Sequence, residues 1–217
     1  FQSINIFLIC FLLFNFDVFN KLQLSNGIIL LIYLFVGLIL VNCINFMDGI
    51  DGLVASNMLL IFFNYSLNNN LDLIAIPIVL FIFLFYNWSP AKLFMGDSGS
   101  TFLALILFYI TFLNNDLNSA IILLLTASPL LMDSLICILR RFCNNENIFI
   151  PHKKHIYQRL HQNGIKQDKI SIIYAASTFI LIIFSYTNNL IIMSTLTLFI
   201  FFIGFYLKRK YAKPFKS

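Results

Sequence analysis

Eight runs of apolar residues divide the chain, and most of them are long enough to cross a lipid bilayer as a helix. A helical crossing takes about 20 apolar residues, and shorter runs cross where the bilayer thins. Strand-like alternation is absent, so we predict an all-α, polytopic transmembrane helical bundle. The predicted crossings are Ile4–Phe19, Ile28–Asn45, Leu53–Leu67, Leu71–Trp88, Ser100–Leu113, Leu117–Leu139, Ile170–Thr187 and Leu190–Leu207.

The composition agrees with a membrane environment. Hydrophobic residues make up 60% of the chain and charged residues 11%, with a mean hydropathy of +0.89. A soluble domain is nearer half apolar and a quarter charged. The net charge of +5 is better explained by membrane topology than by a nucleic-acid partner, which we do not expect.

The basic residues gather in alternate loops. We predict one integral-membrane domain over residues 1–217, with polar segments on one side at 46–52, 89–99, 140–169 and the tail 208–217. These segments hold 13 of the 14 Lys and Arg residues, and Lys21 is the exception. Because basic loops stay in the cytoplasm, we expect this side to be cytoplasmic.

Two acidic residues and two glycines follow the second apolar run, in the segment 42–53, NCINFMDGIDGL. Asp48 and Asp51 are three residues apart, so they share a face if the backbone is helical. Gly49 and Gly52 allow a ligand to approach the backbone closely. An ordinary polar turn would also use Asp and Gly, but ionisable residues at the edge of a membrane span are usually functional.

A second polar motif, FMGDSGS, occupies residues 94–100. Asp97 is a hard oxygen ligand of the kind that Mg²⁺ combines with waters and substrate phosphate. The Ser and Gly residues after it favour a helix N-terminus whose free N–H groups can bind phosphate. A simple helix cap explains this motif equally well when it is taken alone.

The long basic loop contains three His residues within PHKKHIYQRLH at positions 151–161. Its cations are suited to a diphosphate and its rings to stacking on a base or ribose. Contact with anionic lipid would explain the Lys and Arg residues but not the His residues. His152 and His155 have the spacing of zinc ligands, but no Cys or carboxylate lies nearby in the sequence to complete a set.

Other polar residues have structural explanations. Asp133 follows Pro129 inside an apolar run, and Pro can break the helix there. We expect Asp133 to pair with Arg140 or Arg141, with a role in the active site left open.

The cysteines Cys10, Cys43, Cys137 and Cys143 are scattered, which predicts buried, reduced side chains without disulfides.

The three motifs, in this order, resemble those of the polyprenyl-phosphate N-acetylhexosamine-1-phosphate transferases, glycosyltransferase family 4. The resemblance extends from about Asn42 to Leu160. It implies an enzyme of the bacterial inner membrane that transfers a sugar-1-phosphate from a UDP-N-acetylhexosamine to undecaprenyl phosphate and releases UMP. It also implies Mg²⁺, with Mn²⁺ as an alternative, and about 11 helices in the full protein.

The resemblance also implies roles for individual residues. Asp97 matches the family's Mg²⁺-binding Asp, and Phe94 matches a ring that stacks near uracil. The resemblance implies catalytic roles for Asp48, Asp51, Asp97, His152 and His155, and substrate contacts for Asn42, Asn45, Gly49, Phe94, Lys153, Lys154 and Arg159.

Two features depart from the family pattern. His152 and His155 are separated by two lysines and are not adjacent. This pattern resembles the family branch that primes O-antigen and related surface polysaccharides, which disfavours a muramoyl-pentapeptide donor. The family also carries an adjacent Asp-Asp pair upstream, and this chain has none. We therefore expect an N-terminally truncated sequence that has no turnover by itself.

Several alternatives remain open at this stage. They are a phospho-N-acetylmuramoyl-pentapeptide transferase, a non-catalytic truncated paralogue, and an ion-coupled transporter that uses Asp48, Asp51 and Asp133 as a relay. A transporter would tend to hold its site at the midplane between inverted repeats, and no repeat is visible. The identity of the UDP-sugar and the existence of a homodimer stay undecided.

Overall fold

The computed structural model of the protein describes residues 26–69, 71–113, 116–147, 150 and 152–215. These residues form helices and no strands, which confirms the all-α prediction. The predicted crossing Ile4–Phe19, together with Cys10, lies outside the described residues. The elements are α2 (Asn26–Met47), α3 (Leu53–Asn68), the 3-10 helix η2 (Leu71–Ile74), α4 (Ala75–Asn87), α5 (Gly96–Leu113), α6 (Leu117–Thr126), α7 (Ser128–Cys143), α8 (Ile156–Gln162), α9 (Gln167–Ser185) and α10 (Leu190–Tyr211).

Described helices occupy the other seven predicted crossings, although not all of them are long enough to be counted as spans. Four described helices, α2, α5, α9 and α10, are long and apolar enough to span a membrane. The pair α6–α7 would make a fifth span if it is counted as one. The segments Leu53–Asn68 and Leu71–Asn87 are apolar but shorter. The chain is therefore a polytopic membrane protein.

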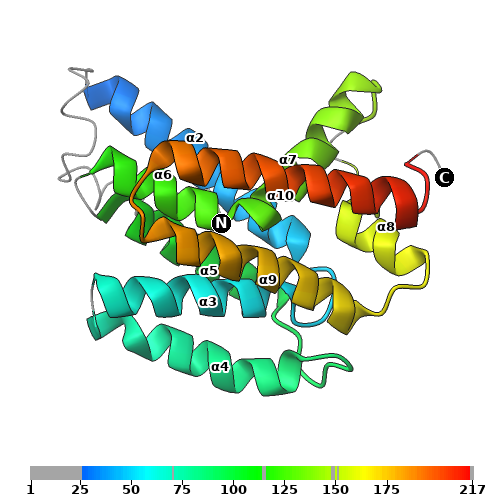
Figure 1. The fold of residues 1–217 in the computed structure, drawn as a ribbon, viewed down its shortest axis with the longest axis horizontal. Coiled ribbons are helices and arrows are strands. Elements are labelled where there is room, and N and C mark those ends of the chain that lie inside the picture. The colour runs from blue at the N-terminus through cyan, green and yellow to red at the C-terminus, as the bar shows by residue number, and fades with distance from the viewer. Residues whose placement is uncertain (1–25, 70, 114–115, 148–149, 151, 216–217) are drawn as a thin grey trace.

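One predicted crossing, Leu117–Leu139, is a pair of helices rather than a single one. The axes of α6 and α7 are bent by 77° at the break between Thr126 and Ser128. Pro129 stands in the first turn of α7, where its missing N–H is tolerated. Within a continuous helix its ring would clash with the carbonyl of Leu125, so α6 ends and α7 starts in a new direction. Figure 1 shows the far end of α7 projecting away from the bundle.

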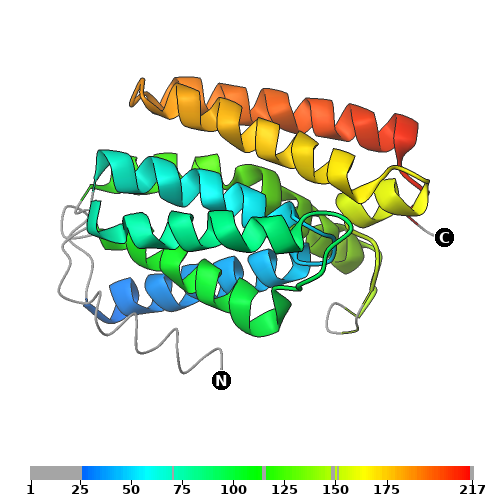
Figure 2. The ribbon, with the colours of Figure 1, turned by 90° about the horizontal axis from the view of Figure 1, so that it is seen from below.

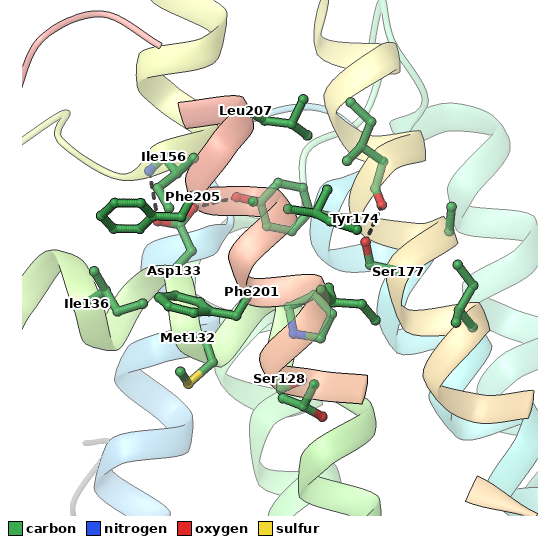
Figure 3. Close-up of a pocket in the computed structure, with 18 of the residues that line it drawn as sticks. Ser128, Met132, Asp133, Ile136, Ile156, Tyr174, Ser177, Phe201, Phe205 and Leu207 are labelled. Atoms are coloured by element: carbon green, nitrogen blue, oxygen red, sulfur yellow. Dashed lines mark hydrogen bonds between the residues drawn. The ribbon is translucent and has the colours of Figure 1, made fainter. Parts of the chain in front are cut away.

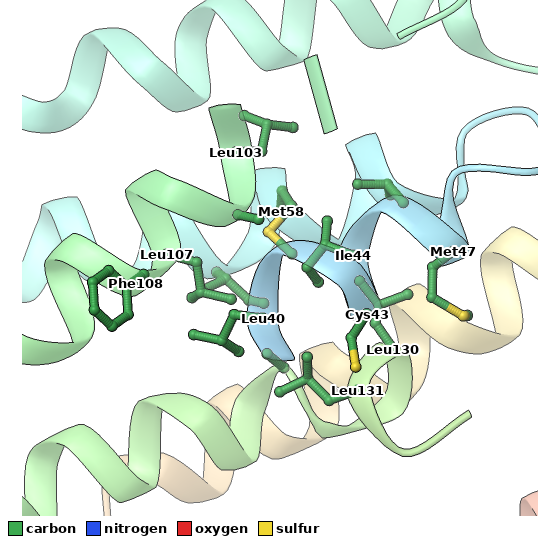
Figure 4. Close-up of a cluster of buried hydrophobic side chains, with 14 of the residues drawn as sticks. Leu40, Cys43, Ile44, Met47, Met58, Leu103, Leu107, Phe108, Leu130 and Leu131 are labelled. Carbon is green, nitrogen blue, oxygen red and sulfur yellow. The ribbon is translucent and has the colours of Figure 1, made fainter. Parts of the chain in front are cut away.

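The core forms where α2 packs against α5 and α7, with α3 completing the contact. Large apolar side chains of these four helices are almost fully buried and interdigitate, as Figure 4 shows. Because lipid tails are as apolar as these side chains, the contact is stabilised by close van der Waals packing between the helices and not by removal of apolar surface from water. The labelled members are Leu40, Cys43, Ile44, Met47, Met58, Leu103, Leu107, Phe108, Leu130 and Leu131.

The last two helices lie side by side along one face of the bundle, as Figures 1 and 2 show. α9 packs on α3, whereas α10 packs on α9 and the α6–α7 pair. Much of the outer surface of α10 is apolar and exposed, with Ile191 and Phe202 as examples. Such a surface suits contact with lipid.

The polar connections gather at one end of the bundle. The turn between α2 and α3, the loop between α4 and α5, and helix α8 all lie near the chain's C-terminal end in Figure 1. The sequence motifs belong to these connections, so the fold brings them to the same end of the molecule.

Candidate active site

Two motifs meet where the end of α2 approaches the start of α5. The side-chain nitrogen Nδ2 of Asn45, in the last turn of α2, donates to Oδ1 of Asp97 at 3.2 Å. The same nitrogen donates to Oγ of Ser100 at 3.0 Å. Asp97 lies in the first turn of α5, which begins at Gly96, earlier than the predicted Ser100. Asn45 thus joins the two motifs and fixes the orientation of the Asp97 carboxylate.

Asp48 follows directly after α2 and lies close enough to Asp97 for the two charges to repel. Burial, with the charge of Asp97 as a second cause, raises the pKa of Asp48 to about 6. Within the described part of the chain, the carboxylate of Asp48 makes no hydrogen bond. Two neighbouring carboxylates with free oxygens form a donor set of hard oxygens, which fits a divalent cation such as Mg²⁺. We call Asn45, Asp48 and Asp97 the acidic cluster.

Asp51 has a different environment, although it lies only three residues after Asp48. Its Oδ2 accepts a hydrogen bond from the backbone N–H of Ala91 at 3.0 Å. Its own N–H donates to Oε1 of Gln167 at 2.9 Å, and its carbonyl accepts from Oγ of Ser171 at 2.7 Å. Asp51 therefore ties the turn to the α4–α5 loop and to the start of α9. These contacts give it a structural role, and its catalytic role stays a prediction.

Gly52 fixes the course of the α4–α5 loop. It has a φ of 73°, and a Cβ there would lie 2.9 Å from Cε3 of Trp88. Its N–H donates to Oδ1 of Asn87 at 3.1 Å, and Nδ2 of Asn87 donates to the carbonyl of Leu93 at 2.9 Å. These bonds hold the loop so that it presents Phe94, a residue that is 73% exposed. The Phe94 ring is free to stack on a planar ligand.

Tyr157 joins helix α8 to the motif after α2. Its hydroxyl donates to the carbonyl of Phe46 at 2.9 Å. A Cβ on Gly49 would overlap that hydroxyl oxygen, so this position has no room for a side chain. The ring of Phe46 also lies 6.0 Å from the ring of His155. The His-rich loop is therefore held next to the turn that carries Asp48.

Asp133 anchors the start of α8, as Figure 3 shows. Its Oδ1 accepts from the N–H of Ile156 at 2.7 Å, and its Oδ2 accepts from the N–H of Tyr157 at 3.1 Å and the hydroxyl of Tyr174 at 2.7 Å. The prediction that Asp133 pairs with Arg140 or Arg141 is wrong. The carboxylate is buried among backbone donors, which provide the compensation that a buried charge needs.

Asp133 also borders a largely apolar cavity. The cavity has a volume of about 330 Å³ and lies between α7, α9 and α10. Figure 3 shows Met132, Ile136 and Phe201 among its lining. None of the residues of the acidic cluster lines it, so this cavity and the candidate active site are separate features.

The His-rich loop brings its first two histidines together with a cysteine. The rings of His152 and His155 are stacked with centroids 5.0 Å apart. Burial lowers the pKa of both to about 4, helped by the mutual effect of the two rings at His152 and by Arg141 at both. Both rings are therefore neutral near pH 7 and can donate or accept hydrogen bonds. Cys137 lies beside them, whereas the sequence suggested no Cys near this pair.

Several basic residues of the loop are engaged within the protein. Lys154 Nζ lies 3.0 Å from Oε1 of Glu146, and Arg141 Nε lies 3.2 Å from Oε2 of the same residue. Arg159 is 5% exposed, and its guanidinium donates to the carbonyl of Lys213 in the C-terminal tail. Arg159 therefore anchors the tail, and its substrate-binding role stays a prediction. Lys153 is exposed.

Asn42 and the described cysteines make no hydrogen bond to the side chains of the acidic cluster. Nδ2 of Asn42 donates to the carbonyl of Leu38 at 2.7 Å, one turn back in α2, and not to the acidic cluster. Cys43 and Cys137 are buried free thiols as predicted, whereas Cys143 is exposed because it ends α7. No disulfide occurs among the described residues.

Sequence reasoning assigned no role to several residues that organise this site. Tyr157 connects α8 to α2, Tyr174 connects α9 to α7, and Asn87 and Gln167 fix the turn after α2. Asn87, Tyr157 and Gln167 lie at the ends of α4, α8 and α9 beside the motif loops, which was the available signal, whereas Tyr174 lies within α9. Their partners lie up to 116 residues away in the sequence, as for Asp51 and Gln167, so spacing alone could not identify them.

Comparisons with known proteins extend these observations. The family model described as glycosyl transferase family 4 matches residues 2–115. The probable undecaprenyl-phosphate N-acetylglucosaminyl 1-phosphate transferase of Bacillus subtilis (strain 168) is 33% identical over 180 residues, covering 75% of this chain and 48% of the relative. The decaprenyl-phosphate N-acetylglucosaminephosphotransferase of Mycobacterium leprae (strain TN) is 31% identical over 174 residues, covering 66% of this chain and 43% of the relative.

A second group of relatives has a different printed activity. The phospho-N-acetylmuramoyl-pentapeptide-transferase of Dictyoglomus turgidum (strain DSM 6724 / Z-1310) is 42% identical over 89 residues, covering 37% of this chain and 29% of the relative. The chain spans about half the length, or less, of each of these three relatives.

Proposed function

The chain belongs to glycosyl transferase family 4, the superfamily of polyprenyl-phosphate N-acetylhexosamine-1-phosphate transferases, and on that premise we propose a specific reaction for it. An oxygen of a polyprenyl phosphate attacks the β-phosphorus of a UDP-N-acetylhexosamine. The bond from that phosphorus to the oxygen bridging the two phosphates breaks, and the bridging oxygen leaves with UMP. The product is a polyprenyl-diphospho-sugar, the starting lipid for a cell-envelope polysaccharide.

The acidic cluster carries this proposal. Asp97 and Asp48 present neighbouring carboxylates, and Asn45 orients one of them through the 3.2 Å bond. These residues suit Mg²⁺, or Mn²⁺ as an alternative, and the cation would neutralise the charge that develops on the transferred phosphoryl group. Phosphoryl transfer depends mainly on positioning and charge stabilisation, which is what such a cluster provides.

The surrounding residues have complementary roles in the proposal. The exposed ring of Phe94 stacks on the uracil base, and Gly49 leaves room for the Tyr157 hydroxyl, which holds α8 against the turn that carries Asp48. His152 and Lys153 contact the diphosphate or the sugar from the loop before α8, and the buried ring of His155 supports the His152 ring by stacking on it. Asp51 holds the α4–α5 loop in place, and Asp133 holds the start of α8 in place, through the hydrogen bonds to backbone N–H groups described above.

For the sugar donor, we favour an N-acetylhexosamine over muramoyl-pentapeptide. The spread of His152 and His155 in HKKH supports this choice, as does the printed name of the Bacillus subtilis relative. UDP-N-acetylglucosamine is the first donor to test. UDP-N-acetylmuramoyl-pentapeptide is the second candidate, because other relatives are named as phospho-N-acetylmuramoyl-pentapeptide-transferases. In both cases we expect the acidic cluster to face the cytoplasm of a bacterial inner membrane.

The proposal can be tested by the release of UMP. The full-length protein is incubated in detergent with undecaprenyl phosphate and Mg²⁺. UDP-N-acetylglucosamine and UDP-N-acetylmuramoyl-pentapeptide are supplied in parallel. We expect Mg²⁺-dependent UMP release with the first donor and little with the second. Release with the pentapeptide donor alone would overturn the choice of donor, and release with neither, in an assay where a known transferase of the family works, would overturn the proposed reaction.

A further inference from the structure

Cys137, His152 and His155 converge from two elements that the sequence separates. Cys137 lies near the end of α7, and the two histidines lie in the loop before α8. One ligand atom from each of the three, a sulfur and two ring nitrogens, lies within 4.8 Å of the others. A zinc ion with bonds of about 2.0–2.3 Å holds its ligands about 3.5 Å apart, so a small rotation of the side chains would complete the geometry.

The Nδ1 atom of His155 is buried without a hydrogen-bond partner among the described residues. His155 is 2% exposed, and its side chain faces the N–H of Gln158 in a capping box, yet its Nδ1 makes no hydrogen bond within the part of the chain that the structure describes. A buried polar atom without a partner costs about 1–3 kcal/mol, which a bound ligand would remove. Cys137 is also buried at 3% exposure, whereas His152 is only partly buried and leaves a route of entry from solvent.

The backbone around the group is held in place before any ion binds. Asp133, one turn before Cys137 on α7, accepts from the N–H groups of Ile156 and Tyr157 at the start of α8. This pins the segment immediately after His155 against α7. The nearby cations Arg141 and Lys154 would repel a metal ion, but both are paired with Glu146.

We propose that Cys137, His152 and His155 form a binding site for Zn²⁺ that is distinct from the acidic cluster. One thiolate and two imidazoles are soft and intermediate ligands that select Zn²⁺ over Mg²⁺. Binding releases the thiol proton to solvent as the sulfur–zinc bond forms, and a fourth position stays open for water. If the proposed transferase reaction is also correct, Zn²⁺ withdraws His152 from the substrate and inhibits the enzyme.

The test uses Co²⁺ as a coloured substitute for Zn²⁺, with no substrate present. The purified chain, in detergent, reduced and without a polyhistidine tag, is titrated with Co²⁺ and then with Zn²⁺. We expect one equivalent to give a thiolate-to-cobalt charge-transfer band and tetrahedral visible bands, which Zn²⁺ removes and excess Mg²⁺ does not. Because no turnover is measured, this result is independent of the proposed reaction.

Matched variants assign the ligands. Cys137→Ser should abolish the charge-transfer band and weaken Zn²⁺ binding at least tenfold, and His152→Ala, at a partly exposed position, should weaken it similarly. Cys143→Ser changes an exposed thiol six residues later on the same helix and should leave the bands intact, as should Asp97→Asn. Absence of thiolate bands in the parent chain, or their persistence in folded Cys137→Ser, would overturn the proposal.

Discussion

Asp48 and Asp97 differ from Asp51 and Asp133 in what their carboxylates contact. The first two lie beside each other with few internal partners, and the pKa of Asp48 is raised to about 6. The second two accept hydrogen bonds from backbone N–H groups, one at Asp51 and two at Asp133. The first pair is available to a ligand, whereas the second pair holds elements of the protein together.

The contrast shows that the acidic residues of one motif do not share one task. Asp48 and Asp51 belong to the same turn, yet only Asp51 is used to connect that turn to α9 and the α4–α5 loop. A carboxylate that is hydrogen-bonded by the protein cannot turn toward a cation without losing those bonds. Substitution of Asp48 should therefore affect stability in the opposite direction to substitution of Asp51 or Asp133.

The largest effect is expected at Asp133. Asp133→Ala should lower the free energy of unfolding by about 3–5 kcal/mol, since two N–H groups and one hydroxyl lose their partner at about 1–3 kcal/mol each. Tyr174→Phe removes only one of these bonds and should cost about 1 kcal/mol. Chemical unfolding in mild detergent measures both variants. Equal losses for the two variants would show that Asp133 does not anchor α8.

Asp48 should behave in the opposite way. Its raised pKa means that, between about pH 4 and 6, the folded protein keeps a proton that the unfolded chain has released, so stability falls as the pH rises through this window. In metal-free buffer at pH 7, Asp48→Asn should be more stable than the parent chain by at most about 3 kcal/mol, given about 1.4 kcal/mol per pKa unit.

Asp51→Asn provides the comparison for Asp48→Asn. It weakens the bond from the Ala91 N–H and should cost about 1 kcal/mol at the same pH. Melting temperatures measured from pH 4 to pH 7 follow both variants. If Asp48→Asn retained the pH dependence of the parent chain, the charge of Asp48 would not be its source.

A smaller effect on stability is expected at the contact between the turn after α2 and helix α8. Gly49→Ala places a methyl group against the hydroxyl of Tyr157 and should cost about 1–3 kcal/mol through overpacking. Adding Tyr157→Phe removes that oxygen and should restore part of the loss, which a double-mutant cycle reports as a coupling energy. Gly204→Ala, in α10 with nothing within 4 Å of the added methyl group, is the control and should be neutral or stabilising. The absence of coupling would argue against the contact.

The sequence predicted most of the fold because apolar length is a local property. Seven predicted crossings coincide with described helices, and Pro129 indicated where one of them breaks. The 77° bend could not be predicted, because it depends on how α7 packs against α2 and α9 after the break.

Less of the site could be predicted. The sequence predicted that the motif with Asp97 lies on the same membrane side as Asp48, and the structure places Asp97 beside Asn45 at one end of the bundle. The use of Asp51, Asp133 and Arg159 within the protein depends on loops that pack across long sequence separations, for example Arg159 with Lys213. Residue type and spacing indicate which groups are ionisable, but only the packed loops determine which of them remain free.

The central claim is that Asp97 and Asp48 bind a metal ion together with a uridine diphosphate. UDP binding to the purified chain tests this claim without requiring turnover. It is measured as the rise in melting temperature that UDP causes, with and without Mg²⁺. We expect Mg²⁺-dependent stabilisation in the parent chain and in Asp168→Asn, which makes the same change of charge in the first turn of α9. We expect Asp97→Asn to lose it while its unliganded stability stays within about 0.5 kcal/mol, because Asp97 is exposed. Unchanged Mg²⁺-dependent stabilisation in Asp97→Asn would contradict the account.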